Sequence, residues 1–137
     1  MTGAHAYELV VGAAAVDRHG HVNNVEYVRW MNEAAVAHAD ARGWSAAAEA
    51  AGGAWVARAH RIDYLRPAFA GDRVRVLTWV VDVRGASSLR RYRIERAGDN
   101  TVLAEAETDF AFVDARTGRP RRIPADLKAA FAVPHSA

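Results

Sequence analysis

The sequence predicts an α+β fold in which one long helix packs against an antiparallel sheet. Two observations support this fold class. Apolar residues recur at helical spacing over one long stretch, residues 25–42. Beyond residue 54 the chain changes to strand-like segments separated by short turns. A helix lying on such a sheet buries the apolar faces of both.

The elements before the sheet can be assigned in order. A short apolar strand is predicted over residues 7–11, followed by a polar loop over residues 17–24. Asn23 or Asn24 can cap the long helix, because a side-chain oxygen accepts from the first free helical N–H groups. Gly43 is typical of a helix C-terminus, and residues 45–51 are predicted to form a second, shorter helix.

Four strands are predicted in the rest of the chain, over residues 55–65, 74–83, 89–96 and 102–113. The turn at residues 97–100 joins the last two strands, and residues 124–131 suggest a terminal helix. Alternation along the third strand places Arg90 and Arg91 on opposite faces of the sheet. Alternation in the fourth puts one set of side chains on a single face, namely Val102, Ala104, Ala106, Thr108, Phe110 and Phe112.

Length and composition limit the class of protein. The 137 residues, 51% hydrophobic and 25% charged, fit a single globular domain over residues 1–137. The chain has no cysteine, which excludes disulfides, thiolate metal sites and a cysteine nucleophile. It lacks a long apolar run, and residues 1–16 do not resemble a signal peptide. We therefore expect a soluble, cytoplasmic protein with no membrane partner.

Arginine carries nearly all of the positive charge, although the formal net charge is only +2. Two clusters stand out: Arg84, Arg90, Arg91, Arg93 and Arg96, and then Arg116, Arg119, Arg121 and Arg122. Guanidinium groups bind phosphate well, so these clusters could bind a phosphorylated cofactor, an acidic protein or a nucleic acid. The alternative is that they form a solvated strand face with no partner. No nucleic-acid-binding motif accompanies the clusters, so no nucleic-acid partner is expected.

The densest polar segment, residues 17–24, immediately precedes the long helix. Helix N-termini carry free N–H groups and partial positive charge, which stabilise a substrate oxygen that becomes negative. Asp17 is a candidate to activate water or to attack directly, with a plain turn residue as the alternative. His19 and His21 have only Asp17 nearby as a further ligand, so no metal site is expected.

Here the sequence resembles a known family. The run Asp17-x-x-Gly20-His21-Val22-Asn23-Asn24-x-x-Tyr27-x-x-Trp30 is similar to hotdog-fold thioesterases of the 4-hydroxybenzoyl-CoA thioesterase/YbgC type. Its central part also resembles plant acyl-ACP thioesterases. Later segments continue the resemblance in the family's order: residues 62–68 with Gly71-Asp72, residues 84–89, and residues 117–120 with Ile123-Pro124.

The resemblance implies a long central helix wrapped by a curved antiparallel sheet, with subunits paired edge to edge as dimers or tetramers. It implies hydrolysis of an acyl-CoA thioester, with Asp17 as general base or nucleophile. The backbone N–H of Asn24 would polarise the carbonyl, and His21 would orient substrate or water. CoA belongs to the substrate, so no cofactor is implied. The alternatives are an acyl-ACP thioesterase of fatty acid or polyketide synthesis and a non-catalytic acyl-CoA-binding protein.

The same resemblance nominates a set of substrate-binding residues: Asn23, Tyr27, His60, Arg84, Ser87, Ser88, Arg90 and Arg91. The serines and arginines lie in or beside the turn that approaches CoA in the family, and only one of Arg90 and Arg91 is expected to reach it. For Trp55 and Tyr64, core packing is favoured over a place in the acyl site. The chain departs from YbgC-like proteins at Asn24, where they usually carry histidine, and from plant enzymes at His19, where they carry asparagine.

Overall fold

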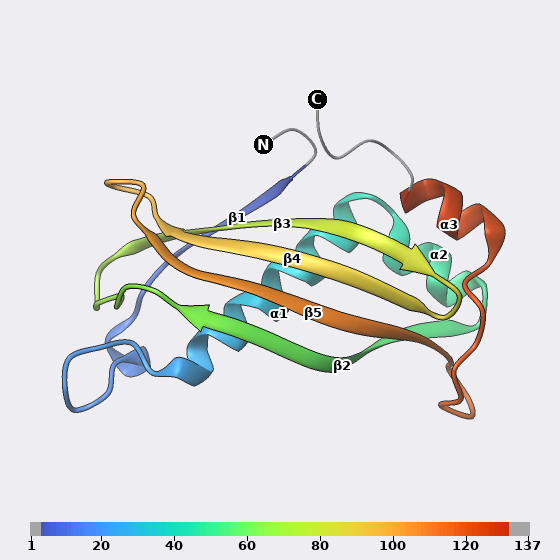
Figure 1. Cartoon of the computed structure of the whole chain (residues 1–137), viewed down its shortest axis with the longest axis horizontal. Helices are drawn as coiled ribbons and strands as arrows, with labels where there is room; N and C mark the ends of the chain where they lie inside the picture. Colours follow the sequence, from blue (N-terminus) through green and yellow to red (C-terminus); the bar gives the residue numbers. More distant parts are fainter. Residues whose placement is uncertain (1–3, 132–137) are drawn as a thin grey trace.

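One antiparallel sheet and a helix along it form the structure, a computed structural model that describes residues 4–131 (Figure 1). The sheet has five strands in the order β1-β3-β4-β5-β2. The strands are β1 (His5–Val10), β2 (Gly53–Tyr64), β3 (Arg73–Arg84), β4 (Ser87–Arg96) and β5 (Val102–Asp114). The helices are α1 (Asn24–Ala41), α2 (Trp44–Ala50) and α3 (Ala125–Phe131), with a 3-10 turn at Ala13–Ala15. The predicted α+β class is confirmed, and every predicted element is present with its ends within two residues of those expected.

Helix α1 forms because a capping side chain marks its start and an apolar stripe along it can be buried against the sheet. The side chain of Asn23 accepts a hydrogen bond from the N–H of Val25 at 3.0 Å and so caps the first turn. Buried residues recur at positions three and four apart and face the sheet: Tyr27, Trp30, Met31, Ala34, Ala35 and His38. They pack against the inward face of β3 and β4, including Val74, Val76, Tyr92 and Ile94.

A second, smaller core lies at the other end of the sheet, where α2 and α3 cover it (Figure 1). Trp44, Phe112 and Phe131 are buried there. Between the two cores the sheet carries a polar interruption, because Arg90 on β4 and Thr78 on β3 face inward beside His38. The interior is therefore apolar at both ends and polar in the middle.

Strand β2 is one edge of the sheet and pairs only with β5 among the described strands. Most of its residues are exposed, and the pairing register shifts between Ala57 and Ala59. This bulge leaves Arg58 without a β5 partner in the register. A long exposed edge of this kind presents free backbone groups that another strand can pair with.

In the described part of the chain, none of the helices has the length and apolar character needed to cross a membrane.

Candidate active site

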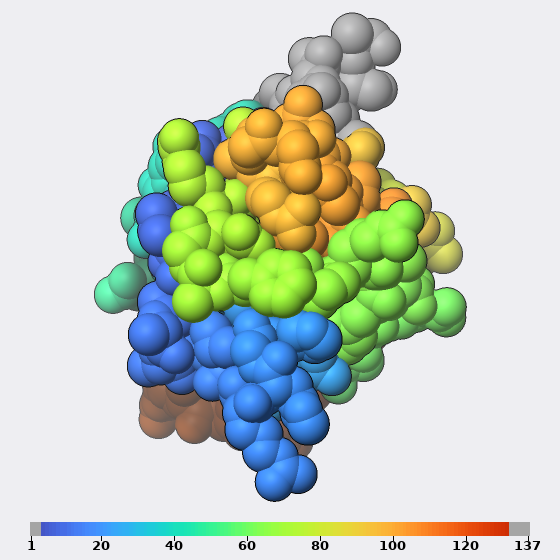
Figure 2. Space-filling model, turned by 90° about the vertical axis from the view of Figure 1, so that its left-hand side faces the viewer, coloured from blue at the N-terminus to red at the C-terminus, as the bar shows by residue number. Residues whose placement is uncertain are grey.

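Asp17 lies in a loop that is closed tightly on itself before α1. The loop is held by a bridge between Val16 and Val22 and by the hydrogen bond from the N–H of Asp17 to the carbonyl of His21, at 2.8 Å. Gly20 has a φ of +84°, a backbone conformation that favours glycine, and this allows the tight turn. Figure 2 shows the loop, in blue, projecting from one end of the molecule beside the green segment that follows β2.

The Asp17 carboxylate is exposed and fixed through one of its two oxygens. Its Oδ1 accepts from the N–H of His19 at 2.9 Å and from the N–H of His21 at 3.3 Å. Its Oδ2 has no hydrogen-bond donor within the described residues. The loop thus orients the carboxylate and leaves one oxygen open to water or substrate.

The backbone N–H of Asn24 is a free donor at the helix entrance. Its neighbours are used: the N–H of Asn23 donates to Ala15, that of Val25 to the Asn23 side chain, and that of Glu26 to the Asn23 carbonyl. The N–H of Asn24 has no acceptor among residues 4–131. As the first residue of the helix, Asn24 also lies where the helix dipole adds partial positive charge. A carbonyl oxygen is the ligand that such a donor suits.

Tyr64, at the end of β2, ties the helix entrance to the sheet. Its phenol donates to the carbonyl of Asn24 at 3.0 Å, and its ring packs edge-on against Tyr27 at 5.0 Å between ring centroids. Tyr64 is 44% exposed, so the favoured core interpretation was wrong for this residue. Tyr27 is itself buried beneath it, which places its side chain inside the core rather than on the surface of the loop.

The two histidines of the loop have different surroundings. His21 pairs with Phe69 through a backbone bridge, and its ring lies edge-on to that phenylalanine at 5.4 Å. His19 is exposed. No three histidine, aspartate or glutamate side chains in the described part of the chain come close enough to share a metal ion.

The residues expected near CoA lie on both faces of the sheet. Ser88 and Arg90 face inward and are buried, whereas Arg91 is exposed and pairs with Glu107 at 3.7 Å. The prediction that Arg90 and Arg91 lie on opposite faces is confirmed. Arg84 is exposed beside the β3–β4 turn, paired with Asp82 at 3.0 Å.

Two further residues show how the edge strand is fastened. Ser87 accepts from Arg58 at 2.7 Å, and the same guanidinium pairs with Asp109 at 3.1 Å. No local pattern points to Arg58, because its partners lie on two other strands. His60 is hydrogen-bonded to Thr108 at 2.7 Å, on the face of β2 that also carries Tyr64.

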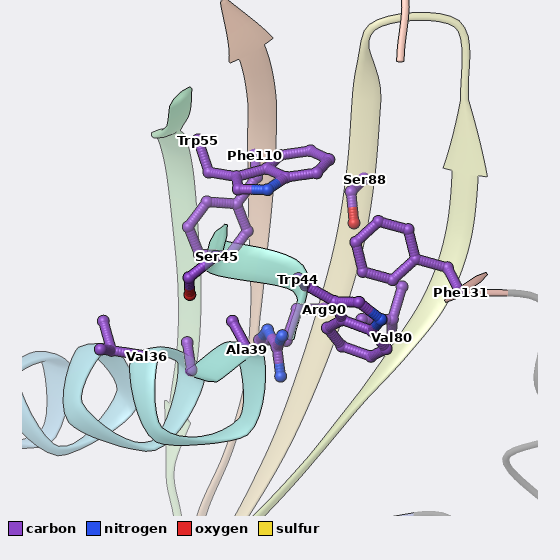
Figure 3. Close-up of a pocket in the computed structure, with 11 residues that line it drawn as sticks. Val36, Ala39, Trp44, Ser45, Trp55, Val80, Ser88, Arg90, Phe110 and Phe131 are labelled. Atoms are coloured by element: carbon purple, nitrogen blue, oxygen red, sulfur yellow. The ribbon is translucent and has the colours of Figure 1, made fainter. Parts of the chain in front are cut away.

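A cavity of about 170 Å³ opens at the far end of α1 (Figure 3). Its walls are aromatic, with Trp55 and Phe110 on one side and Trp44 and Phe131 on the other. Arg90 lies between them, next to α1. Sequence reasoning does not assemble this cavity, because α1, α2, α3 and four strands all contribute to its lining.

The cavity is distant from the Asn24 donor of the same chain. Val36, at the rim, lies twelve residues beyond Asn24 on α1. At about 1.5 Å of rise per residue, the separation along the helix is about 18 Å. The two features therefore sit at opposite ends of one helix.

Known proteins resemble this chain in sequence and in architecture. Residues 11–131 match the family described as the thioesterase-like superfamily. The acyl-CoA thioester hydrolase YbgC of Escherichia coli is 35% identical over 78 residues, which is 57% of this chain and 58% of that protein. The match thus spans less than two thirds of this curated relative.

Solved structures share the whole fold. A 1,4-dihydroxy-2-naphthoyl-CoA thioesterase from Synechocystis superposes with a TM-score of 0.85 at 21% identity, covering 98% of this chain and 100% of that one. A hypothetical protein from Thermus thermophilus superposes with a TM-score of 0.84 at 28% identity, covering 94% and 98%. These likenesses confirm the predicted hotdog fold, a long helix wrapped by a curved antiparallel sheet.

Proposed function

The chain belongs to the thioesterase-like superfamily, and from this premise we propose that it hydrolyses acyl-CoA thioesters to a free acid and CoA. The observation that carries the proposal is the pairing of two groups in one short segment. Asp17 offers an unpartnered carboxylate oxygen, and the N–H of Asn24 offers an unpartnered donor at a helix entrance. Ester-type hydrolysis needs both a base or nucleophile and a stabiliser for the developing oxyanion.

In the general-base route, a water oxygen attacks the thioester carbonyl carbon while its proton passes to Oδ2 of Asp17. The carbonyl oxygen becomes negative and accepts from the N–H of Asn24, which is already fixed in place. The C–S bond then breaks, and the CoA sulfur leaves and takes up a proton. In the covalent route, Oδ2 itself attacks the carbonyl carbon, CoA leaves, and water cleaves the resulting anhydride. Both routes use the same open oxygen.

We infer that the acyl group reaches from this site into the cavity of a second copy. The exposed edge of β2 suits antiparallel pairing with another β2, which would place the Gly53 end of one strand beside the Tyr64 end of the other. Trp55 of the cavity lies at the first end, and Tyr64, which contacts Asn24, lies at the second. A dimer would therefore bring each cavity to the Asp17–Asn24 site of its partner, and this is the assembly that we propose.

The test is thiol release from a panel of aromatic and aliphatic acyl-CoAs by wild-type protein and by Asp17→Asn. Loss of the carboxylate should lower kcat by about 10²- to 10⁴-fold on the best substrate. Asp126→Asn, an exposed aspartate on α3, is the matched control and should leave kcat unchanged. Equal turnover by wild-type protein and Asp17→Asn would reject the proposed role of Asp17, and no turnover across the panel would reject the activity.

A further inference from the structure

Arg90 is an unusual residue for the interior of a sheet. It is only 5% exposed, it lies in the middle of β4, and it lines the aromatic cavity. A buried charge is costly unless it is paired or hydrogen-bonded. The position of this guanidinium therefore calls for a partner.

The described residues supply hydrogen-bond partners for only one of its nitrogens. Nη1 lies 2.9 Å from Nδ1 of His38 and donates to Oγ1 of Thr78 at 3.0 Å. Nε and Nη2 have no acceptor among residues 4–131, and no carboxylate of these residues lies within 4.0 Å of the guanidinium. Burial lowers the pKa of Arg90 to about 10, which still leaves it charged at neutral pH.

The other arginines of the same strand show the contrast. Arg91 pairs with Glu107, Arg93 with Glu95, and Arg96 with Asp72. Each of these three is more exposed than Arg90, so each needs its carboxylate less. The one arginine of β4 that is buried is the one without an anion in the described part of the chain.

The cavity beside Arg90 has room for a ligand that carries an anion. Its roughly 170 Å³ is slightly more than the volume of an engineered apolar cavity of about 150 Å³ that binds benzene, so it holds one ring or a short chain. Its aromatic walls suit an apolar stem, and the polar groups of Arg90 and Ser88 provide one polar end. Nε and Nη2 point the same way in a guanidinium, and this fork matches the two oxygens of a carboxylate.

We propose that Arg90 sets acyl specificity, by binding a carboxylate at the end of the acyl group remote from the thioester. The substrate class is then a short or single-ring dicarboxylic acid carried as its mono-CoA thioester. This inference rests on the proposed thioesterase function and names the substrate of that same site. Arg90 would touch the substrate at its far end and take no part in bond breaking.

The first experiment compares two substrates of equal chain length, adipoyl-CoA and hexanoyl-CoA. Wild-type protein should prefer adipoyl-CoA by about 10- to 100-fold in kcat/KM, as expected for hydrogen bonds to a buried charge. Arg90→Met, which keeps the side chain long and unbranched, should lose this preference and retain or improve turnover of hexanoyl-CoA. Arg90→Lys keeps the charge without the fork and should retain part of the preference. Arg93→Met, on the outer face of the same strand, should behave as wild type.

The second experiment measures binding without turnover. The probes are two non-hydrolysable thioethers of CoA, one bearing a 5-carboxypentyl chain and the other a hexyl chain, titrated by calorimetry. The carboxylated thioether should bind wild-type protein about 10- to 100-fold more tightly, and Arg90→Met should abolish the difference. Melting temperatures of both Arg90 variants establish that they are folded.

The outcomes separate the two proposals. Carboxylate-selective, Arg90-dependent binding with no hydrolysis of any acyl-CoA would overturn the thioesterase function and support Arg90 as the anion-binding residue. Hydrolysis that favours hexanoyl-CoA in wild-type protein, or an equal loss on both substrates in Arg90→Met, would overturn the specificity role. Absence of binding by the carboxylated thioether would overturn the specificity role, whereas only the lack of turnover across the whole acyl-CoA panel would overturn the thioesterase function.

Discussion

The donor at the helix entrance belongs to the main chain, so its role can be separated from the side chain that carries it. Asn24 is the first residue of α1, where proline is tolerated because the N–H has no intrahelical partner. The preceding residue, Asn23, has φ −61° and ψ 135°, a conformation that proline requires of its predecessor. Proline at position 24 would therefore delete the donor with little change in the fold.

We predict that Asn24→Pro lowers kcat by about 10²- to 10³-fold, the range found when one oxyanion donor is removed. Asn24→Ala keeps the N–H and should remain within a few-fold of wild type. The measurement is steady-state thiol release, with melting temperatures showing that both variants are folded. Comparable activity in the proline and alanine variants would exclude the Asn24 amide as the donor.

At the scale of single residues, the sequence predicted where candidate residues lie along the chain better than it predicted which side chains they contact. Asp17 and Asn24 stand out as candidates in the sequence because they lie within one short run before a helix, and their catalytic roles stay predictions. Alternation showed that Arg90 and Arg91 face opposite sides, but it did not show which of them is buried, because a two-residue period carries no absolute direction. The contacts of Arg90 with His38 and Thr78 join a helix and two strands, and nothing local in the sequence records them.

Among the elements, β2 shows how one glycine allows an edge strand to begin. Gly53 is buried, and a Cβ placed on it would overlap the ring of Phe112, which is also buried. Phe112 belongs to the small core beneath α2 and α3 and packs against Trp55 at 5.0 Å between ring centroids. The start of β2 and the aromatic wall of the cavity therefore depend on the same close contact.

We predict that Gly53→Ala lowers the free energy of unfolding by about 1–3 kcal/mol, the usual cost of overpacking a core. Gly98→Ala is the matched control, because a Cβ placed on Gly98 would meet nothing within 4 Å. This control should change stability by less than about 0.5 kcal/mol. Urea unfolding of the two variants and wild type gives the comparison. Equal stability of all three would mean that Phe112 moves aside at no cost.

The elements themselves were largely readable from sequence because local chemistry determines their ends. The Asn23 cap, the polar loop before α1 and the turn at residues 97–100 each mark a boundary that the structure shows. The bulge at Ala57 and Ala59 was not predicted, since it depends on register with β5 rather than on a local pattern. The position of β2 at the edge of the sheet was likewise not predicted, because strand order depends on contacts between residues far apart in the sequence.

At the scale of the whole molecule, the active unit that we propose contains two chains. The cavity and the Asp17 loop lie at opposite ends of α1, so a short acyl group cannot reach both within one chain. In the sequence, only the resemblance to a family suggests that subunits pair. No pattern in the residues themselves indicates it. The separation of about 18 Å along the helix gives that pairing a physical reason.

We predict complementation between two inactive variants. Asp17→Asn lacks the carboxylate, and Val36→Trp fills the rim of the cavity from an exposed position on α1. Unfolding and refolding an equal mixture forms dimers in which one of the two sites combines the intact halves. Thiol release should therefore return to about a quarter of the wild-type rate per subunit, since half of the dimers are mixed and each has one active site of two.

The single-variant preparations, refolded alone, are the controls. If each chain housed a complete site, the mixed dimers would stay inactive. Light scattering should give a mass near twice the 14.9 kDa of the chain. A monomer that retains full activity would contradict the two-chain site.

The hydrogen bond from Tyr64 to the carbonyl of Asn24 has a consequence for alkaline conditions. Burial raises the pKa of the Tyr64 phenol above its ordinary value of 10.0, so the phenol keeps its proton and continues to donate as the solution becomes mildly alkaline. Deprotonation, at still higher pH, would place a phenolate against a carbonyl oxygen and push the two apart. The helix entrance, and the direction of the Asn24 amide with it, should therefore hold its geometry up to that limit.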